Sequence, residues 1–402
     1  MKREIEYYDT FATNSGSLDQ RINNATGLSG KNELLDVMAK RRNNVAKDLL
    51  VENICSQKCV ACYYQEDSCK QGIRISEDKI ADVRKAIENL TVTNKDLFTF
   101  YPREITTAMN FLPLYTELLQ DRVLTNGKLL NKSVFEKFKK SGIKRLSITV
   151  PGEKEAYSFY TQEPESTYDQ LLENVSNAVT FGFNVSAFMP LFKQNIKDVT
   201  STVRNLANRG VKEIQFIRIV PEGQAKSLSD AIFIDREDTL SLMRNVNSLR
   251  HELDNKVHLS LFKGYFGPNF YGNSIFKHLS GQINEWPGSE YFCPAINRQF
   301  LCVSAQSNNI YNCFASMSFP EDFMVGKYDE GVIETTKMPI KSEELKDALR
   351  GICSSNACEE QPVCMGGCRV IPYAIAKRNG EPNPMFAGQD FCITQILKEI
   401  SK

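Results

Sequence analysis

The chain has 402 residues, and its 49 lysine and arginine residues balance 49 aspartate and glutamate residues, so the formal net charge is zero. A neutral chain lacks the strongly basic surface that binds nucleic acid or anionic membrane by charge, which excludes those two classes of partner. The hydrophobic share of 42% and the charged share of 24% are typical of a globular protein with a full core. At about 150 residues per domain, this length predicts two to three domains.

Residues 1–6 are mostly charged, and no run of about 18 apolar residues occurs in the sequence. We therefore expect neither a signal peptide nor a membrane span, and a cytoplasmic location. Residues 1–46 are polar and mainly helical in pattern, which predicts an N-terminal helical extension.

Short apolar runs alternate with amphipathic stretches along residues 47–255. The runs that predict strands are 48–54, 97–101, 122–124, 145–150, 185–191 and 211–220. The stretches that predict helices are 76–90, 114–120, 133–140, 168–179, 199–206 and 235–253.

Six strand–helix units predict an α/β fold in which helices cover a parallel sheet. Six units are too few for a closed eight-stranded barrel, so we expect a partial (β/α)6 TIM-like barrel, with a flat doubly wound sheet as the alternative. Both arrangements place the chemistry at the carboxyl ends of the strands, which is where Cys55 follows the first run.

Twelve cysteines fall into two groups that a long cysteine-free stretch separates. The first group is Cys55, Cys59, Cys62 and Cys69, and the second is Cys293, Cys302, Cys313, Cys353, Cys358, Cys364, Cys368 and Cys392. Clustered cysteines in a reducing compartment bind metal or act in catalysis more often than they form disulfides. With only three histidines in the chain, histidine-rich zinc or copper sites are not expected.

The spacing Cys55-x3-Cys59-x2-Cys62 places three thiolates on one loop. Three thiolates can hold three irons of a 4Fe–4S cube and leave the fourth iron open to a small molecule. The alternative is a structural zinc site with Cys69 as its fourth ligand, although zinc sites usually use close cysteine pairs.

This cysteine spacing resembles that of the radical S-adenosylmethionine (radical SAM) enzymes, and the resemblance extends over essentially the whole chain. In that family the amino and carboxylate groups of S-adenosylmethionine (SAM) bind the open iron. One electron from a donor such as flavodoxin or ferredoxin then yields a 5′-deoxyadenosyl radical, which takes a hydrogen atom from the substrate.

The resemblance also implies a set of SAM contacts. Glu104 is the one match to the family's Gly-Gly-Glu segment, which contacts the amino group of SAM. The remaining contacts expected by resemblance are Tyr63 or Tyr64 against adenine, Ser147 and Thr149 at the ribose, and Met189 or Leu191 against adenine.

The run Cys353-x4-Cys358-x5-Cys364-x3-Cys368, followed by Cys392, resembles the SPASM extension of one branch of this family. Upstream, Asn308 stands where the family has a glycine before Cys313, and asparagine tolerates the left-handed backbone that such a turn needs. The resemblance implies two auxiliary 4Fe–4S clusters. Their ligands would be Cys293, Cys302, Cys313 and Cys368 for the first, and Cys353, Cys358, Cys364 and Cys392 for the second. Two zinc knuckles are the alternative, because four thiolates also suit zinc.

The expected organisation is an N-terminal extension (1–46), a radical SAM barrel (47–255), a bridging segment (256–290) and a small, irregular SPASM domain (291–402). Within this frame we expect three 4Fe–4S clusters and SAM as cofactors. The bridging loop at 262–276, rich in glycine and aromatic residues, suits either a ligand contact or an interdomain seam. Cys69 remains outside the ligand sets, either as a hydrogen-atom donor to the substrate or as an ordinary thiol.

The resemblance favours modification of a peptide, by crosslinking or side-chain oxidation, because this is the commonest activity of enzymes with the extension. The residues before Cys55 leave little room for a leader-binding module, so a separate protein would supply one. The alternatives are a dehydrogenase or epimerase acting on a sugar or nucleoside, and a non-enzymatic iron–sulfur or zinc protein.

Overall fold

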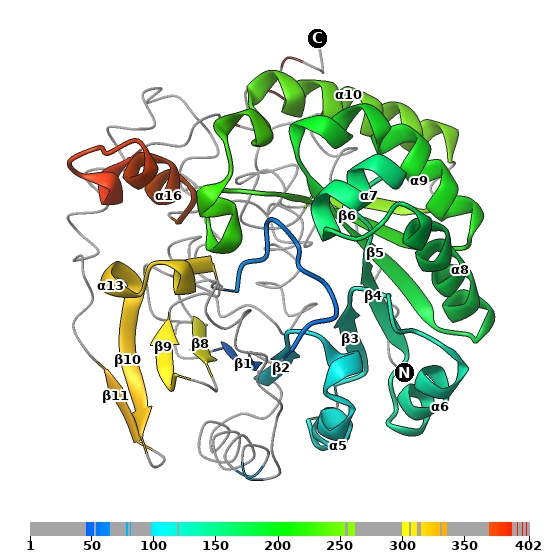
Figure 1. Ribbon diagram of the computed structural model, residues 1–402, viewed down its shortest axis with the longest axis horizontal. Coiled ribbons are helices and arrows are strands. Elements are labelled where there is room, and N and C mark those ends of the chain that lie inside the picture. The colour runs from blue at the N-terminus through cyan, green and yellow to red at the C-terminus, as the bar shows by residue number, and fades with distance from the viewer. Residues whose placement is uncertain are drawn as a thin grey trace, which may run out of the picture.

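The fold is an α/β barrel-like sheet that continues into a smaller C-terminal region (Figure 1). The computed structural model describes residues 46–51, 54–64, 98–118, 120–253, 256–261, 300–304, 307–311, 315–329, 332–335 and 370–387, with single residues 78, 81, 392, 396 and 399. In this part of the chain, no helix is long and apolar enough to cross a membrane.

The predicted strands form two parallel arrays in chain order. The first pair is β1 (Ala46–Val51) and β2 (Phe98–Pro102), and the second sheet contains β3 (Arg122–Thr125), β4 (Arg145–Thr149), β5 (Asn184–Leu191), β6 (Glu213–Arg218) and β7 (His258–Leu261). The first six strands confirm the six apolar runs to within a few residues. The strand β7 was not predicted, because its four residues are too few to carry a periodic pattern.

The side chain of Gln120 joins the two parallel arrays. The Phe100 N–H in β2 donates to Gln120 Oε1 at 2.9 Å, and Gln120 Nε2 donates to the Phe100 carbonyl oxygen at 3.0 Å. The same Nε2 lies 3.3 Å from the carbonyl oxygen of Arg122 in β3. An amide side chain therefore takes the place of strand backbone between β2 and β3.

Helices connect the strands and cover the outer face of the sheet, as the predicted strand–helix alternation requires (Figure 1). They are α5 (Leu112–Glu117), α6 (Lys132–Lys140), α7 (Lys154–Thr161), α8 (Ser166–Thr180), α9 (Val199–Asn208) and α10 (Arg236–Glu252). Five of these were predicted, and α7 was not. Of the predicted helix 76–90, the described residues include only 78 and 81, and both are helical. Short 3-10 turns are η2 (Ile105–Thr107), η3 (Met109–Phe111), η4 (Lys193–Asp198), η5 (Gly223–Ser227) and η6 (Asp230–Ile232).

The core lies between the sheet and these helices. Leu146 and Ile148 of β4 are fully buried in one cluster with Val175 of α8 and Leu206 of α9. Because side chains alternate along a strand, the residues between them face the interior of the barrel. The polar interior position Ser147 accepts from Arg122 Nε at 2.7 Å.

The C-terminal region adds strands to β1. Strand β8 (Phe300–Ser304) pairs parallel with β1, so that Asp48 lies opposite Cys302. Beyond it lie antiparallel β9 (Asn309–Tyr311), β10 (Met324–Asp329) and β11 (Val332–Thr335). As expected, Asn308 adopts a left-handed backbone, with φ of 58°.

The remaining described elements are η7 (Ala315–Ser318), α13 (Pro320–Phe323), α16 (Val370–Arg378) and η8 (Pro384–Phe386). They share an aromatic cluster in which Tyr373 of α16 contacts Phe319 and Phe323 edge-on, with ring centroids 5.0 and 4.8 Å away. The predicted limits at residues 255 and 290 remain predictions; β7 continues the barrel sheet beyond the first of them.

Candidate active site

The loop of residues 54–64, which we call the cysteine loop, leaves the carboxyl end of β1 and carries three half-buried thiols. The Cys62 N–H donates to the Cys59 carbonyl oxygen at 3.2 Å, which closes a tight turn between the second and third cysteine. Cys55, Cys59 and Cys62 therefore lie on one short, ordered segment at the edge of the sheet where parallel α/β folds place their chemistry.

Three other segments hold the backbone of the cysteine loop. The Val60 N–H donates to the Tyr160 carbonyl oxygen in α7 at 2.9 Å, and the Gln224 N–H in η5 donates to the Cys62 carbonyl oxygen at 2.8 Å. The Thr107 hydroxyl donates to the Ile54 carbonyl oxygen. The positions of the cysteines thus depend on residues that follow β2, β4 and β6.

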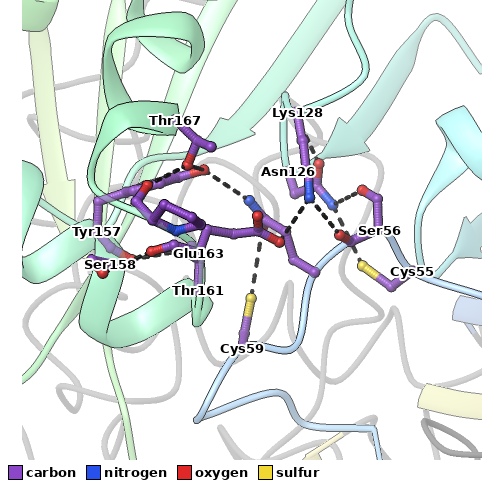
Figure 2. A network of polar contacts seen from close by, with 12 residues as sticks. Cys55, Ser56, Cys59, Asn126, Lys128, Tyr157, Ser158, Thr161, Glu163 and Thr167 are labelled. Atoms are coloured by element: carbon purple, nitrogen blue, oxygen red, sulfur yellow. Dashed lines mark hydrogen bonds and ion pairs between the residues drawn. The ribbon is translucent and has the colours of Figure 1, made fainter.

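A polar network fixes the start of the loop (Figure 2). Asn126 Nδ2 donates to Ser56 Oγ at 3.0 Å and to Cys55 Sγ at 3.4 Å. Lys128 Nζ donates to the Ser56 carbonyl oxygen at 3.2 Å and pairs with Glu163 at 2.8 Å. Both Asn126 and Lys128 follow β3, so the turn after that strand holds the start of the cysteine loop by hydrogen bonds.

A second amide side chain touches the middle of the loop. Gln57 is buried and donates through Nε2 to the Tyr157 hydroxyl of α7 at 3.2 Å. Its Oε1 accepts from the Cys59 thiol at 3.8 Å. Helix α7, which the sequence did not predict, therefore contributes both backbone and side-chain contacts to the cysteine loop.

Glu104 lies beneath this network and is only 1% exposed. Its Oε1 accepts from the Thr106 N–H at 3.0 Å and from the hydroxyls of Thr106 and Thr125, each at 2.7 Å. Its Oε2 accepts from the Asn126 N–H at 2.7 Å. Burial raises the pKa of this carboxyl above its usual value, while the four hydrogen bonds act to lower it. The carboxylate thereby ties the turn after β2 to the turn after β3.

The electrostatic setting of the cysteine loop favours protonated thiols in the metal-free protein. Burial raises the pKa of Cys55 and raises that of Cys59 to about 12, and the neighbouring negative charge of Glu104 acts in the same direction. The positive charge of Arg103 lowers both pKa values in part. A bound metal centre would have to displace these protons, as metal binding to thiols generally does.

The donor set of the loop fits an iron–sulfur cluster. All three candidate ligands are sulfur atoms, which iron–sulfur clusters prefer. Among the described residues, no three His, Cys, Asp or Glu side chains lie close enough to hold one metal ion. A 4Fe–4S cube does not need that closeness, since each thiolate binds its own iron.

The two tyrosines that end the loop lie against each other. The rings of Tyr63 and Tyr64 are 4.5 Å apart between centroids, and the Tyr64 hydroxyl lies 3.5 Å from the Tyr101 carbonyl oxygen. The Arg103 guanidinium carbon lies 5.5 Å from the Tyr64 ring centroid. Tyr64 is 2% exposed and Tyr63 is half-buried, so Tyr63 is the more accessible of the two predicted adenine partners.

The predicted residues on β4 and β5 divide between two faces. Ser147 faces the barrel interior, where it lies 2.7 Å from the Ser186 hydroxyl, and half-buried Thr149 follows on the same face. Met189 and Leu191 are fully buried in the core cluster under the helices. By strand alternation the interior residue of β5 at this level is Phe188, whose ring centroid lies 5.4 Å from the Arg122 guanidinium carbon.

Sequence reasoning missed the residues that grip the loop. The segment 125–127 reads Thr-Asn-Gly, which is typical of a turn, but nothing in its spacing connects Asn126 to Cys55, which lies 71 positions away. Gln57 and Lys128 carry no motif of their own. The signal that was available is the turn itself, because it follows a predicted strand at the catalytic edge of the sheet.

Only two of the eight C-terminal cysteines are among the described residues. Cys302 in β8 is fully buried in a small cluster with Leu50 and Tyr311, and its sulfur lies 3.9 Å from that of Met317. Cys392 is half-buried. Cys293, Cys313, Cys353, Cys358, Cys364 and Cys368, and also Cys69 of the first group, lie outside the described residues, so the auxiliary ligand sets remain predictions.

Residues 49–206, from β1 to α9, match the family model of the radical SAM superfamily. The chain carries a radical SAM domain. This match includes the three-cysteine loop and confirms that the protein is a radical SAM enzyme, a family whose chemistry implies a 4Fe–4S cluster and SAM.

Among curated relatives, "Probable GTP 3',8-cyclase" of Pyrobaculum aerophilum is 22% identical over 245 residues, which cover 55% of this chain and 76% of that protein. "Fe-coproporphyrin III synthase" of Methanosarcina barkeri is 21% identical over 209 residues, which cover 51% of this chain and 50% of that protein.

Solved structures of similar fold match a larger share of this chain than these two curated relatives do. Streptococcus suis SuiB bound to the precursor peptide SuiA matches with a TM-score of 0.58 and 14% identity, over 90% of this chain and 79% of SuiB. Native anSMEcpe with bound AdoMet and Cp18Cys peptide matches with a TM-score of 0.55 and 14% identity, over 88% of this chain and 99% of anSMEcpe. At this identity the likeness shows a shared fold, and it confirms the α/β class and partial barrel expected from the sequence.

Proposed function

We propose that this radical SAM enzyme removes hydrogen from a peptide, forming a crosslink or oxidising a side chain. The observation that carries the proposal is the share of the chain that the similar solved structures cover. Folds solved with bound peptides cover 88–90% of the chain, whereas the two curated relatives named above cover 51–55%. The family model ends at residue 206, and the residues that recognise the substrate would lie beyond it. Coverage of 88–90% means that the peptide-bound structures match most of this later region as well.

We propose that Cys55, Cys59 and Cys62 hold the catalytic 4Fe–4S cluster. When bound, the cluster and SAM supply a 5′-deoxyadenosyl radical after one-electron reduction. The cysteine loop positions this chemistry: its backbone is tied to α7 and η5, and its half-buried setting limits the access of water.

The contacts that the family resemblance implies for SAM have physical support at several positions. The Glu104 carboxylate lies between the turns that follow β2 and β3, and it is the group we assign to the amino group of SAM. Tyr63 offers an aromatic face beside the third cysteine. Ser147 and Thr149 present hydroxyls to the barrel interior for the ribose, and Phe188 replaces Met189 or Leu191 as the apolar partner on β5.

The C-terminal region is proposed to be a SPASM domain over residues 291–402, with the two auxiliary clusters assigned from the sequence. Cys302 is the described member of the first ligand set, and its strand β8 is hydrogen-bonded to β1, which leads into the cysteine loop. This continuity supports an electron path from the catalytic edge toward an auxiliary cluster.

The proposed reaction balances with an internal electron acceptor. The peptide would lose one hydrogen atom to the 5′-deoxyadenosyl radical, which would give 5′-deoxyadenosine. The peptide radical would then lose a proton and an electron as the new bond forms, and an oxidised auxiliary cluster, held by Cys302 among the predicted ligands, would take up that electron. Flavodoxin or ferredoxin would supply the initiating electron, and a separate leader-binding protein would deliver the peptide.

The test uses the anaerobically reconstituted full chain with dithionite, SAM, GTP and any short peptide that a neighbouring gene encodes. The expected result is 5′-deoxyadenosine, together with a peptide lighter by two hydrogen atoms. Cys59→Ala should abolish both products. The second candidate is nucleotide chemistry, which the resemblance to GTP 3',8-cyclase favours. Consumption of GTP in the same assay, with the peptides unchanged, would replace our proposal with that one.

A further inference from the structure

The side chain of Asn126 points at the first cysteine of the catalytic loop. Its Nδ2 lies 3.4 Å from Cys55 Sγ and 3.0 Å from Ser56 Oγ, and the residue is 9% exposed (Figure 2). Donor–acceptor distances to sulfur are longer than those to oxygen because the sulfur atom is larger, so 3.4 Å is a direct contact. The amide therefore donates a hydrogen bond to a sulfur that we assign to the catalytic cluster.

The hydrogen bonds of the Asn126 side chain allow only one of the two orientations of its amide group. Asn126 Oδ1 accepts from the backbone N–H of Lys128 at 2.9 Å, and a backbone N–H can only donate. Turning the amide over would place its NH2 group against that N–H, donor against donor. The oxygen must therefore face Lys128 and the NH2 group must face Cys55.

The backbone of Asn126 is held just as firmly. Its N–H donates to Glu104 Oε2 at 2.7 Å, and the adjacent Thr125 hydroxyl donates to Glu104 Oε1 at 2.7 Å. A buried carboxylate thus anchors the turn from which the amide projects. Because the donor is held in place before any cluster binds, its dipole costs no reorganisation when charge develops on the sulfur.

We propose that Asn126 is a positioning residue that raises the reduction potential of the catalytic cluster through its hydrogen bond to Cys55. This inference rests on the proposed assignment of the cluster to the cysteine loop. Reduction adds one electron to the cluster, and no bond forms or breaks. The added negative charge spreads onto the sulfurs, so an N–H dipole aimed at Cys55 stabilises the reduced state more than the oxidised state.

The effect has a defined size and sign. Losing the donor should lower the equilibrium constant for one-electron reduction by about tenfold, which is about 59 mV toward more negative potential. A low-potential donor would then reduce a smaller fraction of the enzyme.

The chain offers a matched control in Asn174 of α8. This buried asparagine donates to the Gly127 carbonyl oxygen at 2.9 Å and so supports the same turn, but the oxygens to which its Nδ2 donates belong to the backbone. Asn126→Ala and Asn174→Ala each remove one buried side-chain amide that hydrogen-bonds within or to this turn. Only Asn126→Ala removes a donor to sulfur.

The experiment is an anaerobic redox titration of the full-length reconstituted chain, followed by electron paramagnetic resonance of the cluster signal that changes when SAM is added. We expect a negative shift for Asn126→Ala and the wild-type potential for Asn174→Ala, with equal iron per chain. An unchanged potential in Asn126→Ala, or an equal shift in both variants, would overturn the inference.

A second measurement applies even if Asn126→Ala fails to hold a cluster. Wild-type protein labelled with 15N in the asparagine side-chain amide should show a 15N hyperfine coupling in the SAM-responsive signal. The absence of that coupling would overturn the inference. The absence of any SAM-responsive 4Fe–4S signal in wild type would overturn the proposed function as well, so the two failures are distinguishable.

Discussion

Gly223 packs its backbone directly against the carbonyl group of Cys62. A Cβ at Gly223 would overlap the Cys62 carbonyl oxygen and lie 2.6 Å from the Cα of Tyr63. The glycine also has a positive φ of 52°, which side chains disfavour. The next residue, Gln224, donates its N–H to the same Cys62 carbonyl oxygen at 2.8 Å. The turn after β6 therefore sets the position of the third cysteine by close backbone contact.

Gly223→Ala should displace the cysteine loop, because the contacting atoms are backbone and cannot turn aside. We expect a loss of about a hundredfold in 5′-deoxyadenosine formation, the scale of a misplacement of about 1 Å at a reacting centre. The control is Gly142→Ala, which also has a positive φ, 79°, but has nothing within 4 Å of the added Cβ. That variant should lose only about 1 kcal/mol of stability. Equal activity in both variants would contradict the role of the contact.

Gln120→Leu should weaken the junction between β2 and β3. The leucine keeps the volume but leaves the N–H and carbonyl of Phe100 without the amide that they contact. Two backbone groups that lose their partners cost about 1–3 kcal/mol each. The measurement is urea unfolding, with Gln194→Leu at an exposed position of η4 as the control, which should change the free energy of unfolding by less than about 0.5 kcal/mol. Equal unfolding midpoints for the two variants would argue against a bridging role.

The free energy of unfolding should depend on pH in part because of Asp235. It caps α10 by accepting from the backbone N–H groups of Glu237 and Asp238 at 2.9 and 3.0 Å, and it pairs with Lys193 at 2.7 Å. The Lys193 contact and these N–H groups hold the pKa of Asp235 below its usual 3.8. A depressed pKa stabilises the fold above pH 3.8, and that contribution is lost as pH falls through the folded-state value.

Asp235→Asn keeps a good cap but removes this titration. Wild type should therefore be more stable than Asp235→Asn above about pH 4 and lose that advantage below it. Asp235→Ala, which also loses the cap, should cost about 1 kcal/mol more at every pH. Unfolding in urea between pH 3 and pH 7 tests both expectations. A difference between wild type and Asp235→Asn that is the same at pH 3 and pH 7 would contradict the assignment.

The sequence predicted most of the scaffold because its signals are local. Apolar runs marked all six strands from β1 to β6, and the cysteine spacing identified the loop and its family. What it did not predict depends on contacts between distant segments. The bond from Asn126 to Cys55 and the packing of Gly223 on Cys62 join residues that only the folded sheet brings together. The spacing of a motif contains no information about such partners.

The sequence also did not show which side chains of β5 point into the barrel interior and which point toward the helices. A strand alternates its side chains between two faces, so a shift of one residue exchanges core and interior. The end of the strand, with Met189 and Leu191, is apolar at every position, and a continuous apolar run does not reveal which residues face inward. The helices decide this, because they cover the face that Met189 shares with Val185.

Adjacent alanine substitutions on β5 should separate the two faces. Met189→Ala opens a cavity in the core and should cost about 2–5 kcal/mol of stability, with little change in the KM for SAM of the protein that remains folded. Phe188→Ala removes an interior ring that lies 5.4 Å from the Arg122 guanidinium, so it should raise the KM for SAM several-fold at a smaller cost in stability. Thermal unfolding and SAM-cleavage kinetics on the same preparations give both quantities. If Met189→Ala instead raised the KM while its unfolding temperature stayed at that of wild type, the residue would have to face SAM, as the resemblance to the family first suggested, and the interior role of Phe188 would be lost.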